Sequence, residues 1–533
     1  MSVTRRRLIH LVGRAGGISA AYRTMAAMGL LAAPAAYAGP PALPAGSGAG
    51  SKVLILGAGI AGMVAALELG RAGYDCTVLE ARGRAGGRNW SLRASDVVEE
   101  TGGRQPVAWD AGEHLYFNPG PARLPYDHQG ILGYCRELGV ALEVLCNDNR
   151  AAFMHDDAAF AGAPQRNGAV VNDTRGYIAE LAAKAVDAGL LDQPVSDIDK
   201  ERLRAFLRAF GALEADLVYR GSARAGLAEL PGAGTQSGRI AAPLDLRAIV
   251  ASEFWQGPMQ FGELHTMQAT MLQPVGGMGR IGEAFGRMLG ERIVYRREIT
   301  DIRRTGEARG ARVLWRDARS GERGAAEADY VICTLPCPVL RGIDADFSPA
   351  LRAALAAPAY VPAGKIAFQA ERRFWEQDHN IYGGISWTSR DITQIWYPTA
   401  GLHAPKGILV AGYVWSDREG EAFAAKPPAR RAADALADAA HIHPGCAQAL
   451  GNAVSVAWPN IPFTGSAWAE WSRATRKQYY PVLLAGEGPF LFAGEHVSYV
   501  TGWQEGAVLS AHVAVAALAE RVRRAGAPAR ASP

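Results

Sequence analysis

The chain has 533 residues, of which 49% are hydrophobic and 20% are charged, a composition typical of a folded globular protein. Its 56 Lys and Arg exceed its 52 Asp and Glu by only four, and so small a surplus does not indicate a nucleic-acid-binding protein. No stretch after residue 40 has the roughly 18 consecutive apolar residues of a membrane-spanning helix, which excludes a multi-span membrane protein.

The first 38 residues have the features of an export signal. The run Thr4–His10 fits the twin-arginine pattern, a short apolar stretch covers Met25–Ala36, and Ala36–Ala38 is typical of a cleavage site. We therefore expect a twin-arginine-type signal peptide at residues 1–38 that exports the folded protein to the periplasm or out of the cell. Arg14 and Arg23 stand between the twin arginines and this stretch, and a basic unfolded tail is the alternative interpretation.

The strongest local signal follows directly. Lys52–Leu56 is a short apolar run that predicts a buried parallel strand, and the sequence Gly57–Gly62 comes next. Residues 63–71 predict a helix, and residues 75–79 predict a second strand that ends at Glu80. Strand, glycine-rich turn, helix, strand and acid stand in the order of a dinucleotide-binding unit.

Each part of this unit has a physical role. Gly57 allows a tight turn, Gly59 lets the backbone approach a pyrophosphate, and Gly62 lets the helix pack close to the strand. The helix N-terminus stabilises phosphate charge. Glu80 can accept hydrogen bonds from both ribose hydroxyls and would repel a 2′-phosphate, so the nucleotide is not of the NADP type.

The residues after Glu80 distinguish two remaining cofactors. A second glycine-rich turn, Gly86-Gly87-Arg88, follows within eight residues, and a plain NAD dehydrogenase has no need of it. Here the sequence resembles the flavin amine oxidase superfamily, whose first FAD segment combines GxGxxG, an acid and GGR. The resemblance implies FAD, with Arg88 near the diphosphate or the flavin edge.

The resemblance extends over about residues 50–520. Gly120–Pro125 is similar to a motif of the L-amino-acid oxidase branch, and further similar segments follow in the family's order: Trp109–Glu113, Gln273–Met278, Ile293–Ile302, Ala328–Pro336, Gly364–Lys365, Leu491–Glu495 and Thr501–Ala507. No Cys stands in the stretch expected to face the flavin, Trp458–Trp468, so we expect non-covalent FAD. The residues that the resemblance assigns to FAD are Gly57, Gly59, Ala61, Gly62, Glu80, Ala81, Arg82, Gly86, Gly87, Arg88, Arg123, Ile299, Glu495, Gly502, Trp503 and Ala507.

Four residues are predicted to be catalytic. Arg123, in a stiff proline-flanked loop, offers a bidentate fork for a substrate carboxylate. Lys365, within a small and apolar segment, is expected to be buried near the flavin, where it could hold a water. The resemblance implies that the Tyr397 hydroxyl also binds the substrate carboxylate and that the Trp503 indole forms one wall of the pocket. It also implies that the Gly502 carbonyl accepts a hydrogen bond from the substrate amine. Substrate binding is thus assigned to Arg123, Tyr397, Gly502 and Trp503, with Trp396 in place of Tyr397 if the alignment slips by one residue.

A second GxGxxG, at residues 277–282, leaves an alternative open. It would indicate an NADH site, but Pro274 stands just before it and no clear buried strand precedes it. We favour a turn and helix packed beside the FAD.

The predicted fold is α/β, with a discontinuous Rossmann-like FAD-binding domain at residues 50–118, 270–345 and 485–525. Residues 119–269 and 346–484 are expected to form a mixed-sheet substrate domain, which includes a helical block at about 175–219. In detail we expect helices at Arg175–Ala188 and Asp197–Tyr219 and a long loop at Gly221–Arg247.

These signals together predict an FAD-dependent L-amino-acid oxidase that releases a 2-oxo acid, ammonia and hydrogen peroxide. Two alternatives remain within the family: an amine oxidase acting on substrates without a carboxylate, and a monooxygenase that turns the amino acid into an amide. A flavin-bound scaffold without turnover is a third. We expect no metal site, no nucleic-acid partner and no membrane span, and a homodimer is a family-level expectation.

Overall fold

The computed structural model describes residues 37–190 and 196–526, so nearly all of the expected signal peptide lies outside the described residues. From Pro41 onward the chain packs as one unit. Its centre is a five-stranded parallel sheet in the order β12-β2-β1-β16-β25. The strands are β1 (Lys52–Leu56), β2 (Asp75–Glu80), β12 (Ile293–Tyr295), β16 (Tyr330–Cys333) and β25 (Phe490–Phe492). Three distant stretches of chain therefore build one sheet.

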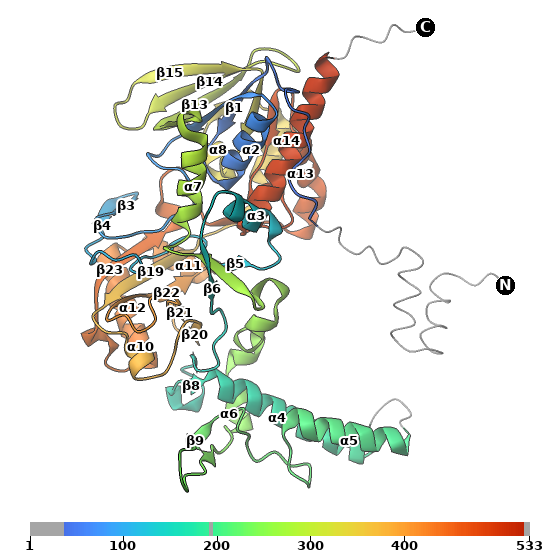
Figure 1. Ribbon diagram of the computed structural model, residues 1–533, viewed down its shortest axis with the longest axis vertical. Helices are drawn as coiled ribbons and strands as arrows, with labels where there is room; N and C mark the ends of the chain where they lie inside the picture. The colour runs from blue at the N-terminus through green and yellow to red at the C-terminus, as the bar shows by residue number, and fades with distance from the viewer. Residues whose placement is uncertain (1–36, 191–195, 527–533) are drawn as a thin grey trace, which may run out of the picture. The chain divides into compact units, whose positions relative to one another are not determined.

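Alternation along β1 explains the layers on either side of this sheet. Val53 and Ile55 pack into an apolar cluster with α2 (Ile60–Arg71), α3 (Gln129–Glu137), α7 (Gly279–Leu289) and α14 (Gln504–Gly526). Leu54 and Leu56 point to the other face, which is covered by a four-stranded sheet together with α9 (Pro349–Ala356) and α13 (Arg473–Ala485). Both faces are covered, as a parallel sheet of continuous apolar strands requires (Figure 1).

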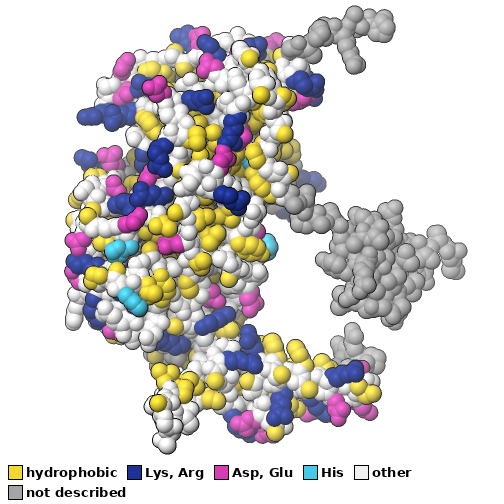
Figure 2. Space-filling view, in the orientation of Figure 1, with side chains coloured by type: hydrophobic (Ala, Val, Ile, Leu, Met, Phe, Trp, Pro, Cys, Tyr) yellow, Lys and Arg dark blue, Asp and Glu magenta, His cyan; other side chains and the backbone are white. Residues whose placement is uncertain are grey.

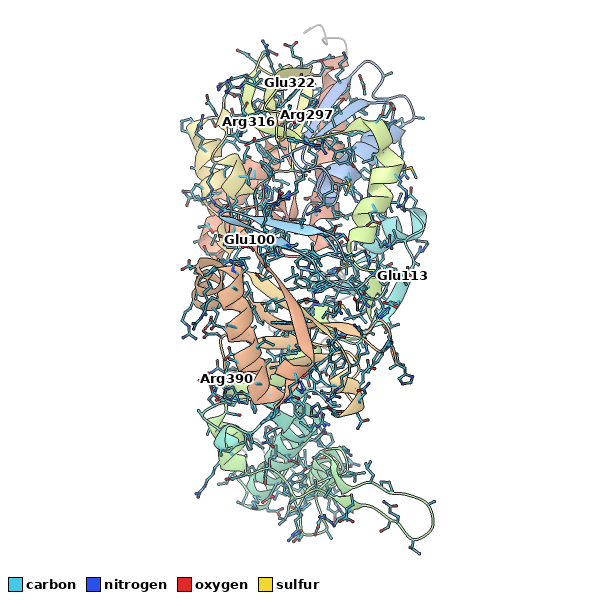
Figure 3. All side chains as sticks on the ribbon, turned by 90° about the vertical axis from the view of Figure 1, so that its left-hand side faces the viewer. Glu100, Glu113, Arg297, Arg316, Glu322 and Arg390 are labelled. Carbon is cyan, nitrogen blue, oxygen red and sulfur yellow. The ribbon has the colours of Figure 1, made fainter. Side chains whose placement is uncertain are left out.

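The covering sheet has the order β15-β14-β13-β17. Its elements and the helices beside it are β13 (Arg297–Arg304), β14 (Ala311–Asp317), β15 (Arg323–Ala328), β17 (Asp344–Ala345), α8 (Cys337–Leu340), α9 (Pro349–Ala356) and α13 (Arg473–Ala485). Arg297 and Arg316, labelled in Figure 3, lie on β13 and β14 respectively. The family-like segment Ile293–Ile302 contributes to two strands, β12 and β13, in different sheets, because the chain turns at Arg296, whose φ is +62°.

A second large sheet has seven strands in the order β23-β19-β22-β21-β20-β7-β8. These are β7 (Phe153–His155), β8 (Gln165–Arg166), β19 (Gly364–Ala370), β20 (Ile385–Thr388), β21 (Gln394–Trp396), β22 (Gly407–Val414) and β23 (Leu450–Ala457). The sheet is mixed, since β20 and β7 run parallel and the other pairs are antiparallel. Helix α12 (Pro428–Ile442) packs its apolar side on this sheet, and α10 (Phe374–Gln377) and α11 (Asp417–Ala425) lie beside it (Figure 1).

The helical block differs from the sequence prediction at its boundaries. Helix α4 (Asn167–Asp187) begins eight residues before the predicted start, and α5 (Asp197–Gly211) ends eight residues before the predicted end. Helix α5 stops because Ala212 takes a left-handed conformation. Tyr219 then folds back on α4 and donates a hydrogen bond to Asp173. Large apolar side chains stay exposed along both helices, where Figure 2 shows yellow groups on the lowest part of the molecule.

The predicted loop at 221–247 contains a short hairpin and leads into another helix. The elements are β9 (Leu227–Glu229), β10 (Arg239–Ile240) and α6 (Leu246–Ala251). The remaining strands are β3 (Val97–Glu100), β4 (Gly103–Pro106), β5 (Leu124–Pro125), β6 (Leu142–Leu145), β11 (Met271–Pro274), β18 (Ala359–Val361) and β24 (Trp468–Glu470). Helix α2 begins at Ile60, three residues earlier than predicted, so the glycine-rich turn forms its first turn.

The second GxGxxG has no dinucleotide-binding framework. Strand β11 before it is antiparallel to β5 and β6 and does not belong to the parallel sheet. A Cβ on Gly282 would lie 2.7 Å from the Cα of Gly86, so this glycine allows α7 to pack against the second glycine-rich turn. The favoured interpretation, a packing helix, agrees with this geometry.

Among the described residues, no helix combines the length and the apolar character that crossing a membrane requires.

Candidate functional site

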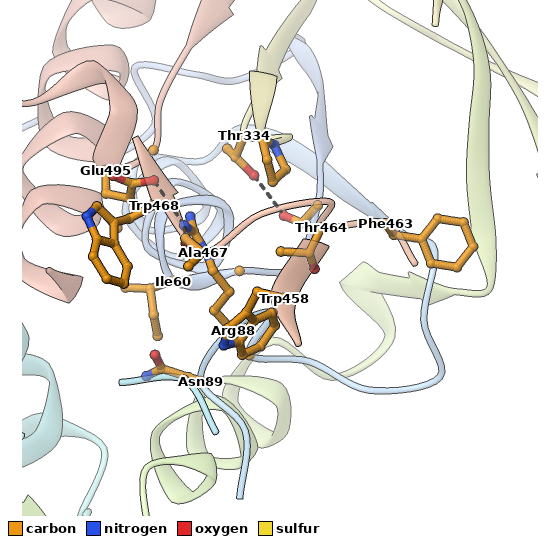
Figure 4. Close-up of a pocket in the computed structure, with 18 of the residues that line it drawn as sticks. Ile60, Arg88, Asn89, Thr334, Trp458, Phe463, Thr464, Ala467, Trp468 and Glu495 are labelled. Carbon is orange, nitrogen blue, oxygen red and sulfur yellow. Dashed lines mark hydrogen bonds and ion pairs between the residues drawn. The ribbon is translucent and has the colours of Figure 1, made fainter. Parts of the chain in front are cut away.

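A cavity of about 660 Å³ opens where the carboxyl ends of β1 and β2 meet the seven-stranded sheet (Figure 4). This is the edge at which open α/β sheets bind ligands, and the volume is that of a small-molecule site. Of the residues predicted to contact cofactor, all but Gly62 line it: Gly57, Gly59, Ala61, Glu80, Ala81, Arg82, Gly86, Gly87, Arg88, Arg123, Ile299, Glu495, Gly502, Trp503 and Ala507.

The first glycine-rich turn presents bare backbone to this cavity. Gly57 has a φ of +99°, and a Cβ built on Gly59 would meet nothing within 4 Å. A Cβ on Gly62 would clash with the Gly57 carbonyl, so Gly62 acts in packing and lies behind the turn. Helix α2 has no side-chain cap and no acid in its first turn. Its N-terminal N–H groups are therefore available to an anion.

Glu80, at the end of β2, is buried on the wall of the cavity. One carboxylate oxygen accepts from the Ala58 N–H and the other from the Arg82 N–H, both at 2.8 Å. These bonds hold the side chain between the first turn and the following segment. Each oxygen keeps a further lone pair for a ligand hydroxyl.

The second glycine-rich turn is tied to the first. The Gly86 N–H donates to the Ala58 carbonyl at 2.8 Å, and Gly86 has a φ of +101°. Arg88, which follows, donates to Glu495 at 3.0 Å and to the Ala467 carbonyl (Figure 4). Glu495 also accepts from the Gly502 N–H at 3.1 Å. Arg88 and Glu495 thus join the N-terminal and C-terminal parts of the cavity wall.

Arg123 also lines the cavity and lies just before β5. Its guanidinium donates to the Asn147 Oδ1 at 2.7 Å and faces the rings of Trp396, Phe261 and Trp503 at 4.5, 5.3 and 6.0 Å from their centroids. Within the described part of the chain, no carboxylate lies within ion-pair distance of it. Burial lowers its pKa to about 10. Arg123 is therefore a cation with free donors in a ligand-sized space.

Lys365 lies beside it on β19 and is 3% exposed. Its Nζ donates to the Gly120 carbonyl at 2.7 Å and to the Asn118 carbonyl at 3.1 Å. The Trp396 and Tyr413 ring centroids lie 5.1 and 4.7 Å from the nitrogen. Burial, and then the charge of Arg123, lower the pKa of Lys365 to about 7. An ammonium with three hydrogens has one more to give into the cavity.

The structure places Tyr397 away from the cavity. Its ring is buried in the core of the seven-stranded sheet, where its hydroxyl lies 2.7 Å from Ser386 Oγ and 2.6 Å from His443 Nε2. Trp396 lines the cavity instead. Neighbouring residues of an extended segment point to opposite faces, so a slip of one residue exchanges the inward side chain. The role expected for Tyr397 in binding substrate is therefore wrong.

Gly502 and Trp503 lie in the turn before α14. Gly502 has a φ of +78°, and the Trp503 ring packs edge-on against His128 with centroids 5.0 Å apart. Gln504 and Ala507, from the first turn of α14, also line the cavity. The N-terminus of a 23-residue helix thus adjoins the ligand space and favours negative charge there.

Two residues that contact the predicted catalytic side chains have no sequence motif of their own. Tyr413 lies directly opposite Lys365 in the β19–β22 pairing, and Asn147 reaches Arg123 from a loop. His265 is exposed, does not line the cavity, and has its Nε2 3.0 Å from an Asp127 carboxylate oxygen. The pairing of β19 with β22 brings Tyr413 to Lys365, and no local sequence motif predicts this long-range pairing.

The comparisons with known proteins agree with this geometry. A family model described as flavin-containing amine oxidoreductase matches residues 60–519. The chain is 28% identical over 474 residues to an L-amino-acid oxidase of Siganus canaliculatus, and the alignment covers 86% of this chain and 84% of that protein. It is 27% identical over 504 residues to a flavin-dependent L-tryptophan oxidase of Lentzea aerocolonigenes, with 88% and 98% covered.

Solved structures show the same fold. A putrescine oxidase bound to putrescine superposes with a TM-score of 0.58 at 18% identity, covering 88% of this chain and 98% of that one. A cyclohexylamine oxidase from Brevibacterium oxydans gives 0.57 at 17% identity, with 89% and 100% covered. The predicted α/β fold class is confirmed.

Proposed function

The chain belongs to the flavin-containing amine oxidoreductase family, and from that premise we propose that it oxidises L-amino acids. The overall reaction takes an amino acid, oxygen and water to a 2-oxo acid, ammonia and hydrogen peroxide. The relatives named L-amino-acid oxidase and L-tryptophan oxidase support this choice, since they align over nearly the whole chain.

The residues present fit FAD. The bare Gly59 backbone and the uncapped N-terminus of α2 suit a pyrophosphate, and a Cβ at Gly59 would point into the space the cofactor needs. Glu80 suits ribose hydroxyls. Of the six cysteines, none lines the cavity, which supports non-covalent binding.

Bound FAD supplies a two-electron acceptor for the substrate Cα–H bond, and oxygen is the final acceptor. The chain's own part is to bind and orient the substrate. Arg123 binds the carboxylate through its guanidinium fork, which suits two parallel hydrogen bonds. Trp396 and Trp503 confine the substrate and keep water away. Lys365, near half protonation at neutral pH, holds a water or a proton at Nζ.

One observation carries the amino-acid proposal. A guanidinium in a ligand-sized cavity has no carboxylate partner among the residues described, although most arginines around it have one or bind carbonyls. Burying such a cation is costly unless a counter-charge arrives. A substrate carboxylate would provide it.

The aromatic walls of the cavity favour substrates whose side chains are large and apolar or aromatic. Trp396, Trp503 and Met267 line the substrate end of the cavity, and Tyr413 stands beside Lys365. Among the residues described there, no acid stands beside Arg123 to pair with a basic side chain.

Product analysis tests the proposed reaction. The purified holoenzyme is incubated in air with an L-amino acid, and peroxide, ammonia, 2-oxo acid and carbon dioxide are measured together. We expect peroxide, ammonia and 2-oxo acid in equal amounts. An amide with carbon dioxide would instead identify a monooxygenase, and no turnover of any amino acid would reject the proposal.

We also propose that the protein is exported folded through the twin-arginine route. The support is the sequence of residues 1–38 alone. Fractionation of the source cells, with Arg5 and Arg6 changed to Lys as the comparison, tests it. The flavoprotein should be lost from the exported fraction in the variant.

Self-association is a further part of this proposal. Ile178, Leu181, Ile198 and Phe206 on α4 and α5 are each more than half exposed. A second copy would remove this apolar surface from water. Sedimentation of wild type and of Phe206→Ser should show a dimer that the substitution weakens.

A further inference from the structure

A group of metal-ligating side chains lies apart from the flavin cavity. His155 ends β7, Asp157 follows in the next turn, and His441 lies near the end of α12. One donor atom from each of these three residues lies within 4.8 Å of the other two. No local motif marks this group, because His155 and His441 are far apart in the chain.

The buried member of the group has a nitrogen without a partner. The His155 side chain is fully buried, and its Nδ1 lies 2.9 Å from Thr388 Oγ1. Its Nε2 makes no hydrogen bond and lies 3.6 Å from an Asp157 carboxylate oxygen. With the proton on Nδ1 and donated to Thr388, the lone pair of Nε2 is directed at the group. An outer hydrogen bond of this kind orients histidine ligands in metal sites.

The surroundings also contain groups that compete with a cation. Arg390 donates to the same Asp157 oxygen at 2.9 Å, and the Gly162 carbonyl is a nearby acceptor for a proton on the imidazole. A carboxylate has a second oxygen, however, and Arg390 also lies 3.4 Å from Asp438. Figure 3 shows Arg390 where the orange C-terminal part meets the blue-green segment that leads to α4.

We propose that His155 Nε2, the Asp157 carboxylate and the His441 imidazole bind one divalent transition-metal ion, with zinc as the best match, and that water completes the coordination. Two imidazoles and one carboxylate are a ligand set typical of zinc, whereas magnesium and calcium prefer oxygen alone. Donor atoms on one zinc ion lie about 3.3 Å apart, since each bond is about 2.0–2.1 Å long. Asp157 and His441 are exposed and can close that gap by side-chain rotation.

The proposed ion would join two parts of the fold. It would connect the end of β7, from which the chain runs to α4, with the end of α12 on the seven-stranded sheet. The site is independent of the flavin and of the proposed reaction.

Zinc binding to the tag-free holoenzyme tests the proposal. The protein is treated with a chelator, dialysed against zinc chloride, and analysed for metal per chain and for its melting temperature with and without zinc. We expect one zinc per chain and a zinc-dependent rise in melting temperature. His441→Gln and Asp157→Asn change exposed residues, so they should fold and lose both effects.

His403→Gln is the matched control, because His403 is another exposed histidine outside the group. It should bind one zinc as wild type does. A wild-type protein that binds no zinc would overturn the proposal. Equal zinc binding by His441→Gln, Asp157→Asn and wild type would also overturn it, because the ion would then be held elsewhere.

Discussion

The guanidinium carbon of Arg123 lies 4.5 Å from the centroid of the Trp396 ring. A cation over the face of an indole is attracted by the ring without using its N–H donors. Among the described side chains, the guanidinium donates a hydrogen bond to that of Asn147 alone. The ring therefore fixes the position of the fork while leaving donors for a ligand. This pairing is the structural basis for recognition of a carboxylate.

Loss of the Arg123 guanidinium fork should slow the oxidation of L-amino acids. Arg123→Met should lower kcat/KM for an L-amino acid by roughly 100-fold, because charge-assisted hydrogen bonds contribute about 1.5–3 kcal/mol each. The amine that lacks the carboxylate should yield no peroxide with either wild type or variant. Steady-state peroxide assays measure both. Arg312→Met, at an exposed arginine of β14, is the control and should change neither rate.

Lys365 gives a prediction about stability and pH. Its pKa is lowered from 10.5 to about 7 by burial, so between these values the unfolded chain binds more protons than the folded one. The cost of burying the charge is therefore fully present below pH of about 7 and fades as the pH rises towards 10.5. Lys365→Met removes this dependence. Its melting temperature relative to wild type should be highest near neutral pH and should fall as pH rises.

The same substitution should slow catalysis. A positioned proton-transferring group typically contributes at least about 100-fold, so turnover by Lys365→Met should drop by at least tenfold. Lys477→Met, on α13 and outside the cavity lining, is the control. Unchanged turnover in the Lys365 variant would show that the lysine is structural.

Neighbouring aromatic residues should behave differently. Trp396→Leu should raise KM several-fold, because the residue lines the cavity and holds Arg123. Tyr397→Phe should leave KM within about twofold and instead lower the melting temperature, since it removes a buried hydroxyl between Ser386 and His443. The reverse pattern would restore the original assignment of Tyr397.

The glycines of the first turn give a matched pair. Gly59→Asp should fold but bind less FAD, because its side chain enters open space and its charge repels the pyrophosphate. Gly62→Val should lose stability, since its side chain would clash with the Gly57 carbonyl. The ratio of flavin to protein absorbance and the melting temperature separate the two effects. Full flavin content in Gly59→Asp would mean that the pyrophosphate lies elsewhere.

The sequence predicts the dinucleotide turn well because its physics is local. Strand, glycines, helix start and Glu80 act over fewer than thirty residues, and the structure has them in that order. The position of Tyr413 could not be predicted in this way. It faces Lys365 only because β19 pairs with β22, more than forty residues away.

The ends of the helices, and the direction in which strand side chains point, are predicted less well from the sequence. The ends of α4 and α5 depend on Ala212 and on the contact of Tyr219 with Asp173, which no helical periodicity reveals. The choice between Trp396 and Tyr397 depends on a register of one residue, which the family motif left open.

The most direct test of carboxylate recognition is a comparison of three related substrates in air. Peroxide is measured with the yellow holoenzyme and L-phenylalanine, D-phenylalanine or phenethylamine, and the series is then repeated with the other L-amino acids and their amines. We predict peroxide from L-amino acids alone. Peroxide from the amines, with none from any L-amino acid, would contradict the account and assign Arg123 a structural role in an amine oxidase.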